Sequence, residues 1–423
     1  MKLTSFWTDN YPRPADLLVA AELPSEVDVA IIGGGYTGLS AARTLAKKGV
    51  SVAVLERETI GYGASSRNGG ITGSGLKKGA PATFKTYGEK LGRELWQASL
   101  DALALVKELV EVEGIDCDFQ QNGDLCVAYK PSHYEGFKQW SAWYENNLGH
   151  TLRLIPPLEL RSEIGSDVFY GGMAGEHGAG LHPAKLVFGL TEVAARNGAI
   201  LCENAAVTRI EKGERGFTLH TARGAIQAKE VLVATNGYTD MLVKGLKPRV
   251  LPVGSYIILT EPLTEELQKE ICPHGRMFYD SKWFLNYFRL TPDGRFLWGG
   301  RTNLSTNLDL NESIRILQPQ MVHTFPQLAG IPVTHSWTGK LGVTFDLMPH
   351  IGRLDGIHYA LGHGGHGLHT ALYLGREVAQ ILTGEKSSSP FAEIPHPTYF
   401  FYRNRTWFLP FAAMFYRIKG WLS

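Results

Sequence analysis

Three glycines near the amino terminus have the spacing of a phosphate-binding turn. Residues 33–38 read G-G-G-Y-T-G and satisfy the pattern G-x-G-x-x-G. Gly33 permits a tight turn, Gly35 lets the backbone approach a pyrophosphate, and Gly38 lets the following helix pack closely on the preceding strand. Tyr36 and Thr37 open that helix, whose free N–H groups and positive dipole end favour bound phosphate. The run therefore predicts a dinucleotide site.

An acidic residue follows at the end of the next predicted strand. The carboxylate of Glu56 can accept hydrogen bonds from a ribose hydroxyl pair, and it would repel a 2′-phosphate. NADP is therefore disfavoured at this site. The neighbouring Arg57 is also assigned to cofactor binding.

A second glycine-rich segment, residues 61–70, reads G-Y-G-A-S-S-R-N-G-G. Its small residues let the backbone approach a ligand, and its serine and arginine side chains can bind a pyrophosphate. The first motif does not distinguish NAD from FAD, whereas this segment favours FAD; a flexible surface loop is the alternative. The predicted cofactor residues here are Ala64, Ser65, Ser66, Arg67, Asn68, Gly69 and Gly70.

Two later segments combine strands with small or glycine-rich turns. A predicted strand at 231–235 runs into A-T-N-G, and residues 360–368 lead into a helix whose amino terminus could face the flavin C2 carbonyl. The spacing of His363, His366 and His369 suits metal ligation, but no carboxylate or cysteine lies nearby, so no metal is predicted. The remaining predicted cofactor residues, all but Val207 and Gly339 in these two segments, are Val207, Thr235, Asn236, Gly237, Gly339, Gly362, His363, Gly364, Gly365, His366, Gly367 and Leu368.

The elements that position these segments are separated along the chain. Buried strands are expected at 27–32, 51–55 and 231–235, and helices at 36–48, 91–113 and 184–197, with strand-rich sequence between them. This pattern predicts an α/β fold with a discontinuous, Rossmann-like FAD-binding domain and a mixed, mainly antiparallel β-sheet substrate domain with helices. The predicted FAD-binding domain comprises residues 1–75, 155–245 and 335–400. The predicted substrate domain comprises residues 76–154 and 246–334, and residues 401–423 form a tail.

Composition narrows the class of protein. A chain of 423 residues exceeds the usual size of one hydrophobic core, and a net charge of +1 gives no indication of a nucleic-acid partner. The four cysteines form no C-x-x-C pair and suit a reducing compartment. Neither a signal peptide nor an apolar run of about 18 residues is visible, so a cytoplasmic location is expected.

The carboxyl-terminal segment at residues 398–423, which contains the tail, is rich in aromatic and basic side chains. Because Pro410 interrupts the segment, a short helix is expected over residues 411–421. Such a helix could lie in a membrane interface, which would place the protein at the inner face of the membrane. Docking of the tail on its own domain is the alternative.

Several motifs together resemble the D-amino-acid-oxidase-type family of flavoproteins. Within that family, the similarity is greatest to the group that contains gamma-glutamylputrescine oxidoreductases and L-pipecolate oxidases, and it extends through nearly all of the chain. Where the former enzymes carry Y-S-G-H-G, residues 363–367 here read H-G-G-H-G. The matching motifs are D-V-A-I-I-G-G-G-Y-T-G-L-S at 28–40, G-Y-G-A-S-S-R-N-G-G at 61–70, G-L-H-P at 180–183, Y-F-R-L-T at 287–291, W-T-G-K at 337–340, M-P-H-I-G-R-L at 348–354 and G-H-G-G-H-G at 362–367.

The resemblance implies that FAD oxidises the C–N bond of an amine or amino acid to an imine, without one base common to all members. Oxygen, giving hydrogen peroxide, or a quinone at the membrane surface would accept the electrons. A flavin-binding subunit without catalytic activity is the remaining alternative. No cysteine lies near residues 342–349, where some relatives attach the flavin, so noncovalent FAD is predicted.

Four residues are predicted to border the substrate cavity: Tyr287, Arg289, Lys340 and His366. Tyr287 and Arg289 alternate with Phe288 on a predicted strand and so share one face, which could instead face solvent or pair structurally. Amino-acid oxidases of the family usually carry an arginine near the position of Lys340 to bind the substrate carboxylate. Lys340 is the nearest cation here, a point charge without a bidentate fork.

Overall fold

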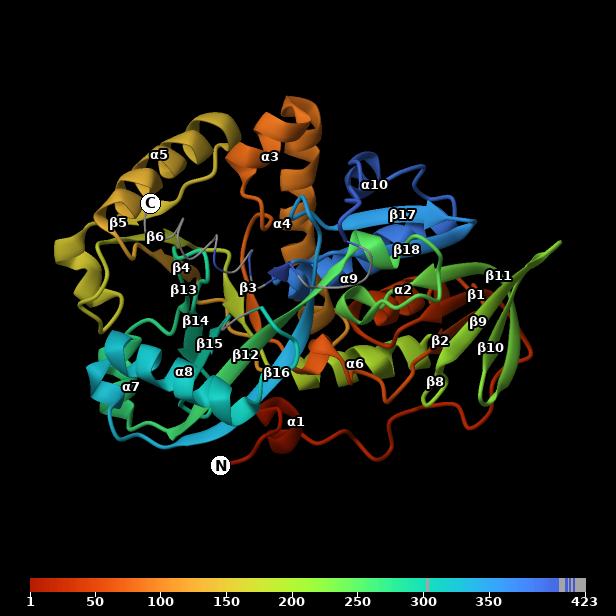
Figure 1. Cartoon of the computed structure of the whole chain (residues 1–423), viewed down its shortest axis with the longest axis horizontal. Helices are drawn as coiled ribbons and strands as arrows, with labels where there is room; N and C mark the ends of the chain where they lie inside the picture. Colours follow the sequence, from red (N-terminus) through yellow and green to blue (C-terminus); the bar gives the residue numbers. More distant parts are fainter. Residues whose placement is uncertain (302–303, 403–407, 410, 412–413, 415–423) are drawn as a thin grey trace.

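Two large sheets flank a central layer of helices (Figure 1). The computed structural model describes residues 1–301, 304–402, 408–409, 411 and 414. A hydrophobic core joins one face of each sheet to these helices, so the two halves of the molecule share a buried centre. The cavity described below opens between the two sheets.

The first sheet is parallel at its centre. Its order is β17-β18-β11-β1-β2-β8, and β10 and β9 continue from β11 as an antiparallel extension. The strands β18, β11, β1, β2 and β8 run parallel, so their carboxyl ends meet at one edge. The strands are β1 (Glu26–Ile32), β2 (Val52–Leu55), β8 (Ile200–Cys202), β9 (Val207–Gly213), β10 (Gly216–Thr221), β11 (Gly224–Val233), β17 (His350–Leu354) and β18 (Ile357–Leu361).

Both faces of the first sheet are covered, which explains its continuous apolar strands. On β1, Val29 and Ile31 pack against the helices, whereas Ala30 and Ile32 face the side covered by β9 and β10. The alternation follows from the period of two residues along a strand. The helices of the central layer are α2 (Tyr36–Ala46), α4 (Glu89–Glu111), α6 (Pro183–Arg196) and α9 (Gly367–Leu382).

The second sheet has the order β16-β12-β15-β14-β13-β4-β6-β5. Among its described strands, only β4 and β13 pair in parallel. One face carries buried aromatic rings, including Phe278, Phe288 and Trp298, in a core shared with α8 (Leu310–Thr324). The strands are β4 (Asp124–Val127), β5 (Arg153–Ile155), β6 (Gly172–Gly175), β12 (Leu251–Pro262), β13 (Met277–Asp280), β14 (Tyr287–Leu290), β15 (Arg295–Gly300) and β16 (Val333–Val343).

Smaller elements connect the two sheets. The pair β3 and β7 forms a two-stranded ribbon beside the cavity. The remaining elements are α1 (Phe6–Asn10), η1 (Ala64–Ser66), β3 (Ile71–Thr72), α3 (Ala80–Tyr87), α5 (Pro131–Leu148), η2 (Pro157–Ser162), β7 (Ala179–Gly180), η3 (Asn236–Tyr238), η4 (Lys247–Arg249), α7 (Glu265–Ile271), η5 (Pro326–Leu328) and α10 (Pro390–Glu393).

The predicted fold class is confirmed, with differences in detail. The strand expected at 231–235 is the end of a longer strand, β11, because the first half of β11 pairs with β10 and its second half with β1. The domain boundaries remain a prediction. Two segments assigned to the FAD-binding domain nevertheless contribute strands to the second sheet, namely β6 and most of β16, because these strands pair with β4 and β12.

The described part of the tail docks on its own chain. Tyr402 is buried and its hydroxyl donates to the carbonyl of Val250 at 3.1 Å, while Leu409 packs in a cluster with Leu251. Phe400 beside them is exposed. Most of the predicted helix over 411–421 lies outside the described residues, and a membrane contact remains a prediction.

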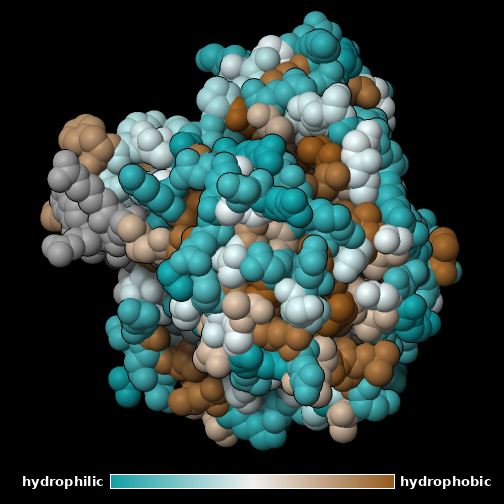
Figure 2. Space-filling model, turned by 90° about the vertical axis from the view of Figure 1, so that its right-hand side faces the viewer, coloured by the Kyte–Doolittle hydropathy of each residue, from teal (hydrophilic) through white to brown (hydrophobic). Residues whose placement is uncertain are grey.

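The outer surface is of mixed character. In Figure 2, on the side of the molecule where β9 and β10 lie, hydrophilic side chains are interspersed with smaller apolar groups. No helix in the described part of the chain combines the length and the apolar character needed to span a bilayer.

Candidate functional site

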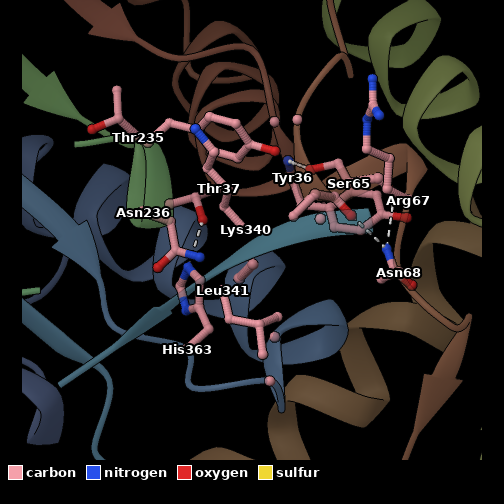
Figure 3. A pocket seen from close by; sticks show the side chains of 18 of the residues that line it. Tyr36, Thr37, Ser65, Arg67, Asn68, Thr235, Asn236, Lys340, Leu341 and His363 are labelled. Carbon is pink, nitrogen blue, oxygen red and sulfur yellow. Dashed lines mark hydrogen bonds between the residues drawn. The ribbon is translucent and has the colours of Figure 1, made fainter. Parts of the chain in front are cut away.

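A cavity of about 610 Å³ lies at the carboxyl edge of the first sheet and extends to the second (Figure 3). It is lined by the start of α2, the end of β2, the segment around η1, the end of β11, part of β16 and the turn before α9. Ligands of open α/β sheets bind outside the carboxyl ends of the strands. The position therefore suits a long ligand that reaches from one sheet to the other.

The amino terminus of α2 forms one wall of this cavity. Gly35 caps the helix without a side chain, and the N–H of Tyr36 donates to the Ser65 hydroxyl at 3.0 Å. A Cβ on Gly35 would lie 2.9 Å from that hydroxyl, so only glycine leaves room for a phosphate to enter. The helix terminus and the segment at 61–70 thus meet as one phosphate cradle.

Glu56 closes the cavity at the end of β2. Its carboxylate accepts the N–H groups of Gly34 at 2.7 Å and Glu58 at 2.9 Å. Burial raises the pKa of Glu56, while these backbone donors lower it. Ribose hydroxyls would add further donors to the carboxylate, so its position fits an adenosine ribose.

Replacing Glu56 by alanine should weaken FAD binding by about 1.5–3 kcal/mol, because charge-assisted hydrogen bonds to the ribose are lost. Fluorescence titration of the apoprotein with FAD measures this change in Kd. Glu56→Gln, which keeps an acceptor but not the charge, should give an intermediate Kd. An alanine variant with the Kd of the wild type would remove Glu56 from the cofactor site.

The turn at 362–366 faces the start of α2 from the opposite side. The Thr37 hydroxyl and His363 Nε2 are 3.2 Å apart, which joins the two helix termini (Figure 3). His363 Nδ1 and both ring nitrogens of His369 are buried without a partner among the described residues. Burial lowers the pKa of His363, and likewise of His369, to about 4, and that of His366 to about 3. Neutral imidazoles and the amino terminus of α9 therefore face the cavity, where a polar ring system could form hydrogen bonds with them.

The loop at 61–70 is fixed through four successive carbonyl groups, those of residues 66–69. Each accepts a hydrogen bond from a different side chain far away in the sequence. The donors are Ser5 Oγ at 3.0 Å, Trp337 Nε1 at 2.8 Å, Trp7 Nε1 at 2.8 Å and Arg289 Nε at 2.9 Å. The loop is therefore held rigidly at the cavity wall, and a flexible surface loop is the wrong interpretation.

Arg289 does not reach the cavity, contrary to the prediction. It shares a strand face with Tyr287, but its guanidinium donates to the carbonyls of Gly69 and Leu181 and lies 5.3 Å from the Trp7 ring. Burial lowers its pKa to about 10. The residue supports the cofactor loop from behind, so structural pairing, the alternative interpretation, is correct for this side chain.

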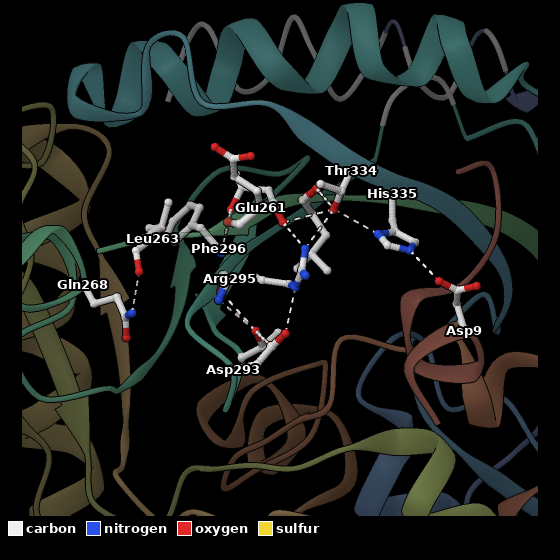
Figure 4. A network of polar contacts seen from close by, with 12 residues as sticks. Asp9, Glu261, Leu263, Gln268, Asp293, Arg295, Phe296, Thr334 and His335 are labelled. Atoms are coloured by element: carbon white, nitrogen blue, oxygen red, sulfur yellow. Dashed lines mark hydrogen bonds and ion pairs between the residues drawn. The ribbon is translucent and has the colours of Figure 1, made fainter. Parts of the chain in front are cut away.

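The amino-terminal helix is anchored by a polar network (Figure 4). Asp9 contacts His335 Nε2 at 3.0 Å, and His335 continues to the Thr334 hydroxyl at 2.9 Å and so to Arg295 at 3.2 Å. This chain of contacts ties α1 to β16 and β15. Ser5 and Trp7 are thereby held where they can reach the cofactor loop.

The part of the cavity toward the second sheet is lined by hydroxyl groups and cations. The Tyr287 hydroxyl lies 3.1 Å from Ser255 Oγ, and Tyr279 is its cross-strand neighbour. Lys77 and Arg301 also line this part; burial, together with Arg301, lowers the pKa of Lys77 to about 7. Burial also lowers the pKa of Arg301, and within the described part of the chain neither cation is paired with a carboxylate.

Both cations border the turn before α9. A Cβ on Gly364 would lie 3.7 Å from Lys77 Cγ, and one on Gly365 would lie 3.4 Å from Arg301 Nη2. The Lys340 ammonium lies 5.5 Å from the centre of the Tyr238 ring. The acidic residues among the lining side chains lie near the end of β2, where Arg57 pairs with Asp240 at 2.5 Å.

Most of the predicted site residues line this cavity. Those that do are Gly33, Gly35, Tyr36, Thr37, Glu56, Arg57, Ala64, Ser65, Arg67, Asn68, Gly69, Val207, Thr235, Asn236, Tyr287, Gly339, Lys340, His363, Gly365, His366, Gly367 and Leu368. Those that do not are Gly38, Ser66, Gly70, Gly237, Arg289, Gly362 and Gly364. The latter shape the segments from behind; Ser66, for example, donates to the Gly61 carbonyl at 2.7 Å.

Sequence reasoning missed several polar residues of the cavity, including Lys77, Tyr279, Arg301 and His369. Lys77 lies just beyond the glycine-rich segment. A cationic side chain beside so many small residues could have indicated a residue of the site. Arg301 follows two glycines at the end of β15, where Gly299 leaves space for the Tyr287 ring. In the described part of the chain, no three His, Cys, Asp or Glu side chains are grouped to hold a metal ion.

The fold and the cavity together define a dinucleotide-binding protein whose cofactor site lies at the edge of a Rossmann-like sheet. The family model for FAD dependent oxidoreductases (DAO) matches residues 28–381, and the chain belongs to this family. Its cofactor is accordingly FAD, and three features fit that group: the cradle, the acidic residue at β2 and the imidazole nitrogens that lack a partner among the described residues.

Two kinds of relatives are similar to the chain. Gamma-glutamylputrescine oxidoreductase of Escherichia coli (strain K12) is 35% identical over 390 residues, which cover 92% of this chain and 90% of the relative. The crystal structure of glycine oxidase from Geobacillus kaustophilus has a TM-score of 0.76 at 23% identity, covering 88% and 100% of the two chains. That of L-proline dehydrogenase from P. horikoshii has a TM-score of 0.73 at 23% identity, covering 87% and 96%.

Proposed function

We propose that this protein oxidises the C–N bond of an amine that also carries a carboxylate, such as an amino acid or a gamma-glutamylputrescine-like compound. Bound FAD would accept two electrons from the substrate, giving an imine, and oxygen would then be reduced to hydrogen peroxide. The observation that supports this substrate class is a pair of cations, Lys77 and Arg301, that have no carboxylate partner among the described residues and lie where the cavity borders the turn before α9.

The residues of this chain have separate roles in the proposal. Arg301 and Lys77 bind the carboxylate, since desolvated cations gain most from a charged partner. Tyr287 and Ser255 orient the substrate through their hydroxyl groups. Lys340 and His366 line the same cavity, and the low pKa of His366, caused by burial, keeps that ring neutral.

Oxygen is the proposed acceptor. Oxygen gains negative charge as it is reduced, and the positive charge of Lys77 and Arg301 favours that change. All four cysteines are free and buried, in keeping with the proposed cytoplasmic location. Membrane contact through the tail, with quinone as acceptor, is the alternative that the following experiment distinguishes.

With a carboxylate-bearing amine, the purified protein should consume oxygen and release hydrogen peroxide in equal amounts. An oxygen electrode combined with a peroxidase-coupled assay measures both. A soluble quinone analogue should not raise turnover in air-saturated buffer. Substrate-dependent reduction of the quinone without peroxide would replace oxygen by quinone in the proposal.

A further inference from the structure

A buried carboxyl group lies directly behind the substrate end of the cavity. Asp124, the first residue of β4, is only 7% exposed. Its Oδ1 has no hydrogen-bond partner among the described residues, and its Oδ2 accepts the Tyr279 hydroxyl at 3.3 Å. Such a group is costly to bury in its charged form. A structural role alone does not explain an acid that has one oxygen without a partner among the described residues.

Three glycines leave room for this carboxyl group. A Cβ on Gly175 would lie 3.1 Å from Asp124 Oδ1, and one on Gly73 would lie 3.6 Å from it. Gly178 approaches from a third direction, where a Cβ would crowd the Asp124 side chain and backbone. Gly73 itself lines the cavity, so the acid is separated from the cavity by a single layer of chain.

Tyr279 connects the acid to the cavity. β4 and β13 pair in parallel with Asp124 beside Met277, so Asp124 and Tyr279 project from the same face of the sheet. Tyr279 lines the cavity and is the cross-strand neighbour of Tyr287. Tyr279 therefore borders the cavity, and its hydroxyl contacts the Asp124 carboxyl behind it.

The burial of Asp124 brings its pKa near neutral pH. Burial raises the pKa of Asp124 to about 7, Arg276 lowers it and Glu176 raises it. Burial also raises the pKa of Tyr279 well above its usual value, so the phenol remains protonated. The ionisable and charged groups around the pair are Cys126 on β4, Arg276 before β13, Glu176 after β6, Lys77 at the cavity wall, Tyr144 on α5 and Asp280 on β13.

We propose that Tyr279 and Asp124 form a relay that removes the proton which the substrate ammonium must lose before its C–N bond is oxidised. The inference rests on the proposed function. One N–H bond of the ammonium breaks as the proton passes to the Tyr279 oxygen, and the original phenolic proton passes to Asp124 Oδ2. The products are a neutral amine and a neutral carboxyl group, and no electrons move in this step.

The relay predicts a characteristic dependence on pH. The relay operates when Asp124 is deprotonated, so the anaerobic rate of flavin bleaching should rise with pH through an inflection near 7. Asp124→Asn should lower this rate about 100-fold at pH 7. Its inflection should move toward the pKa of the amine itself, so the variants should differ little at about pH 10. Tyr279→Phe should behave like Asp124→Asn.

A matched control is available on β13. Asp280 is also fully buried, but it pairs with Lys282 at 2.8 Å on the opposite face of the strand from Tyr279. Asp280→Asn should keep the inflection near 7. An inflection retained by both Asp124→Asn and Tyr279→Phe would overturn the relay. Loss of the inflection in Lys77→Met alone would assign the proton to that lysine instead.

Infrared difference spectroscopy measures the ionisation of Asp124 without substrate turnover. A protonated-carboxyl C=O band should grow as the pH falls through 7 and should be absent from Asp124→Asn. If no such band titrates in the holoenzyme, the relay is wrong, whatever the protein oxidises. If the band titrates as expected but no amine bleaches the flavin, the proposed function fails and the ionisation of Asp124 stands.

Discussion

Replacing Gly38 by alanine should raise the Kd for FAD at least about 100-fold. A Cβ at this position would overlap the carbonyl oxygen of Gly33 and press on Ile31. Both neighbours belong to the strand and turn beneath the helix, so α2 would have to move away from β1. Overpacking of this kind costs about 1–3 kcal/mol or more, and here the displaced helix terminus is the phosphate-binding group.

Titration of apoprotein with FAD, monitored by flavin fluorescence, measures this effect. Gly136 provides a matched control, because it is also a helical glycine but a Cβ there would meet no atom within 4 Å. Gly136→Ala should leave the Kd unchanged and should not lower the melting temperature. Wild-type affinity in a folded Gly38→Ala variant would contradict the assigned phosphate cradle.

Replacing Arg301 by methionine should lower kcat/KM for a carboxylate-bearing amine on the order of 100-fold. A lost charge-assisted hydrogen bond is worth about 1.5–3 kcal/mol, and a desolvated site lies at the upper end. An amine of similar size without a carboxylate should lose far less. Steady-state kinetics with the matched pair of substrates separates the loss of carboxylate binding from general damage to the site.

The variant Lys340→Met tests whether the substrate carboxylate binds Arg301, as proposed from the structure, or Lys340, as expected from the sequence. Lys340 lies above the Tyr238 ring, whereas Arg301 and Lys77 both border the turn before α9. The Lys340 variant should therefore show a smaller change than Arg301→Met with the carboxylate substrate. A larger loss of kcat/KM in Lys340→Met than in Arg301→Met would assign carboxylate binding to Lys340 and not to Arg301.

The fold could be predicted well where local signals agree. The first strand, the glycine turn and α2 were expected within two residues of their observed bounds, because apolar pattern, turn and helix stop coincide there. Helices α5 and α8 were not assigned. The first has exposed aromatic residues such as Trp140, and the second contains Pro319 in its interior, so neither shows a clean apolar stripe.

Site residues within local sequence motifs could be predicted, whereas residues that only strand pairing brings together could not. Cofactor residues in glycine-rich turns were found because backbone approach to a phosphate requires glycine at specific positions. Asp124, Tyr279 and Arg301 lie on ordinary strands or at their ends, and only the pairing of β4, β13, β14 and β15 brings their faces together. The prediction for Arg289 failed for the same reason. Alternation correctly placed Arg289 on the same strand face as Tyr287, but alternation does not show whether a side chain on that face reaches the cavity.

If the protein oxidises a carboxylate-bearing amine, as we propose, such an amine must reduce the bound FAD. The most direct test is an anaerobic titration of the holoenzyme with amines and amino acids while the flavin absorbance is recorded. We expect bleaching by at least one substrate that carries both an amine and a carboxylate, with a carbonyl product after the imine hydrolyses. A flavin that dithionite bleaches but that no amine or amino acid reduces would contradict the proposal.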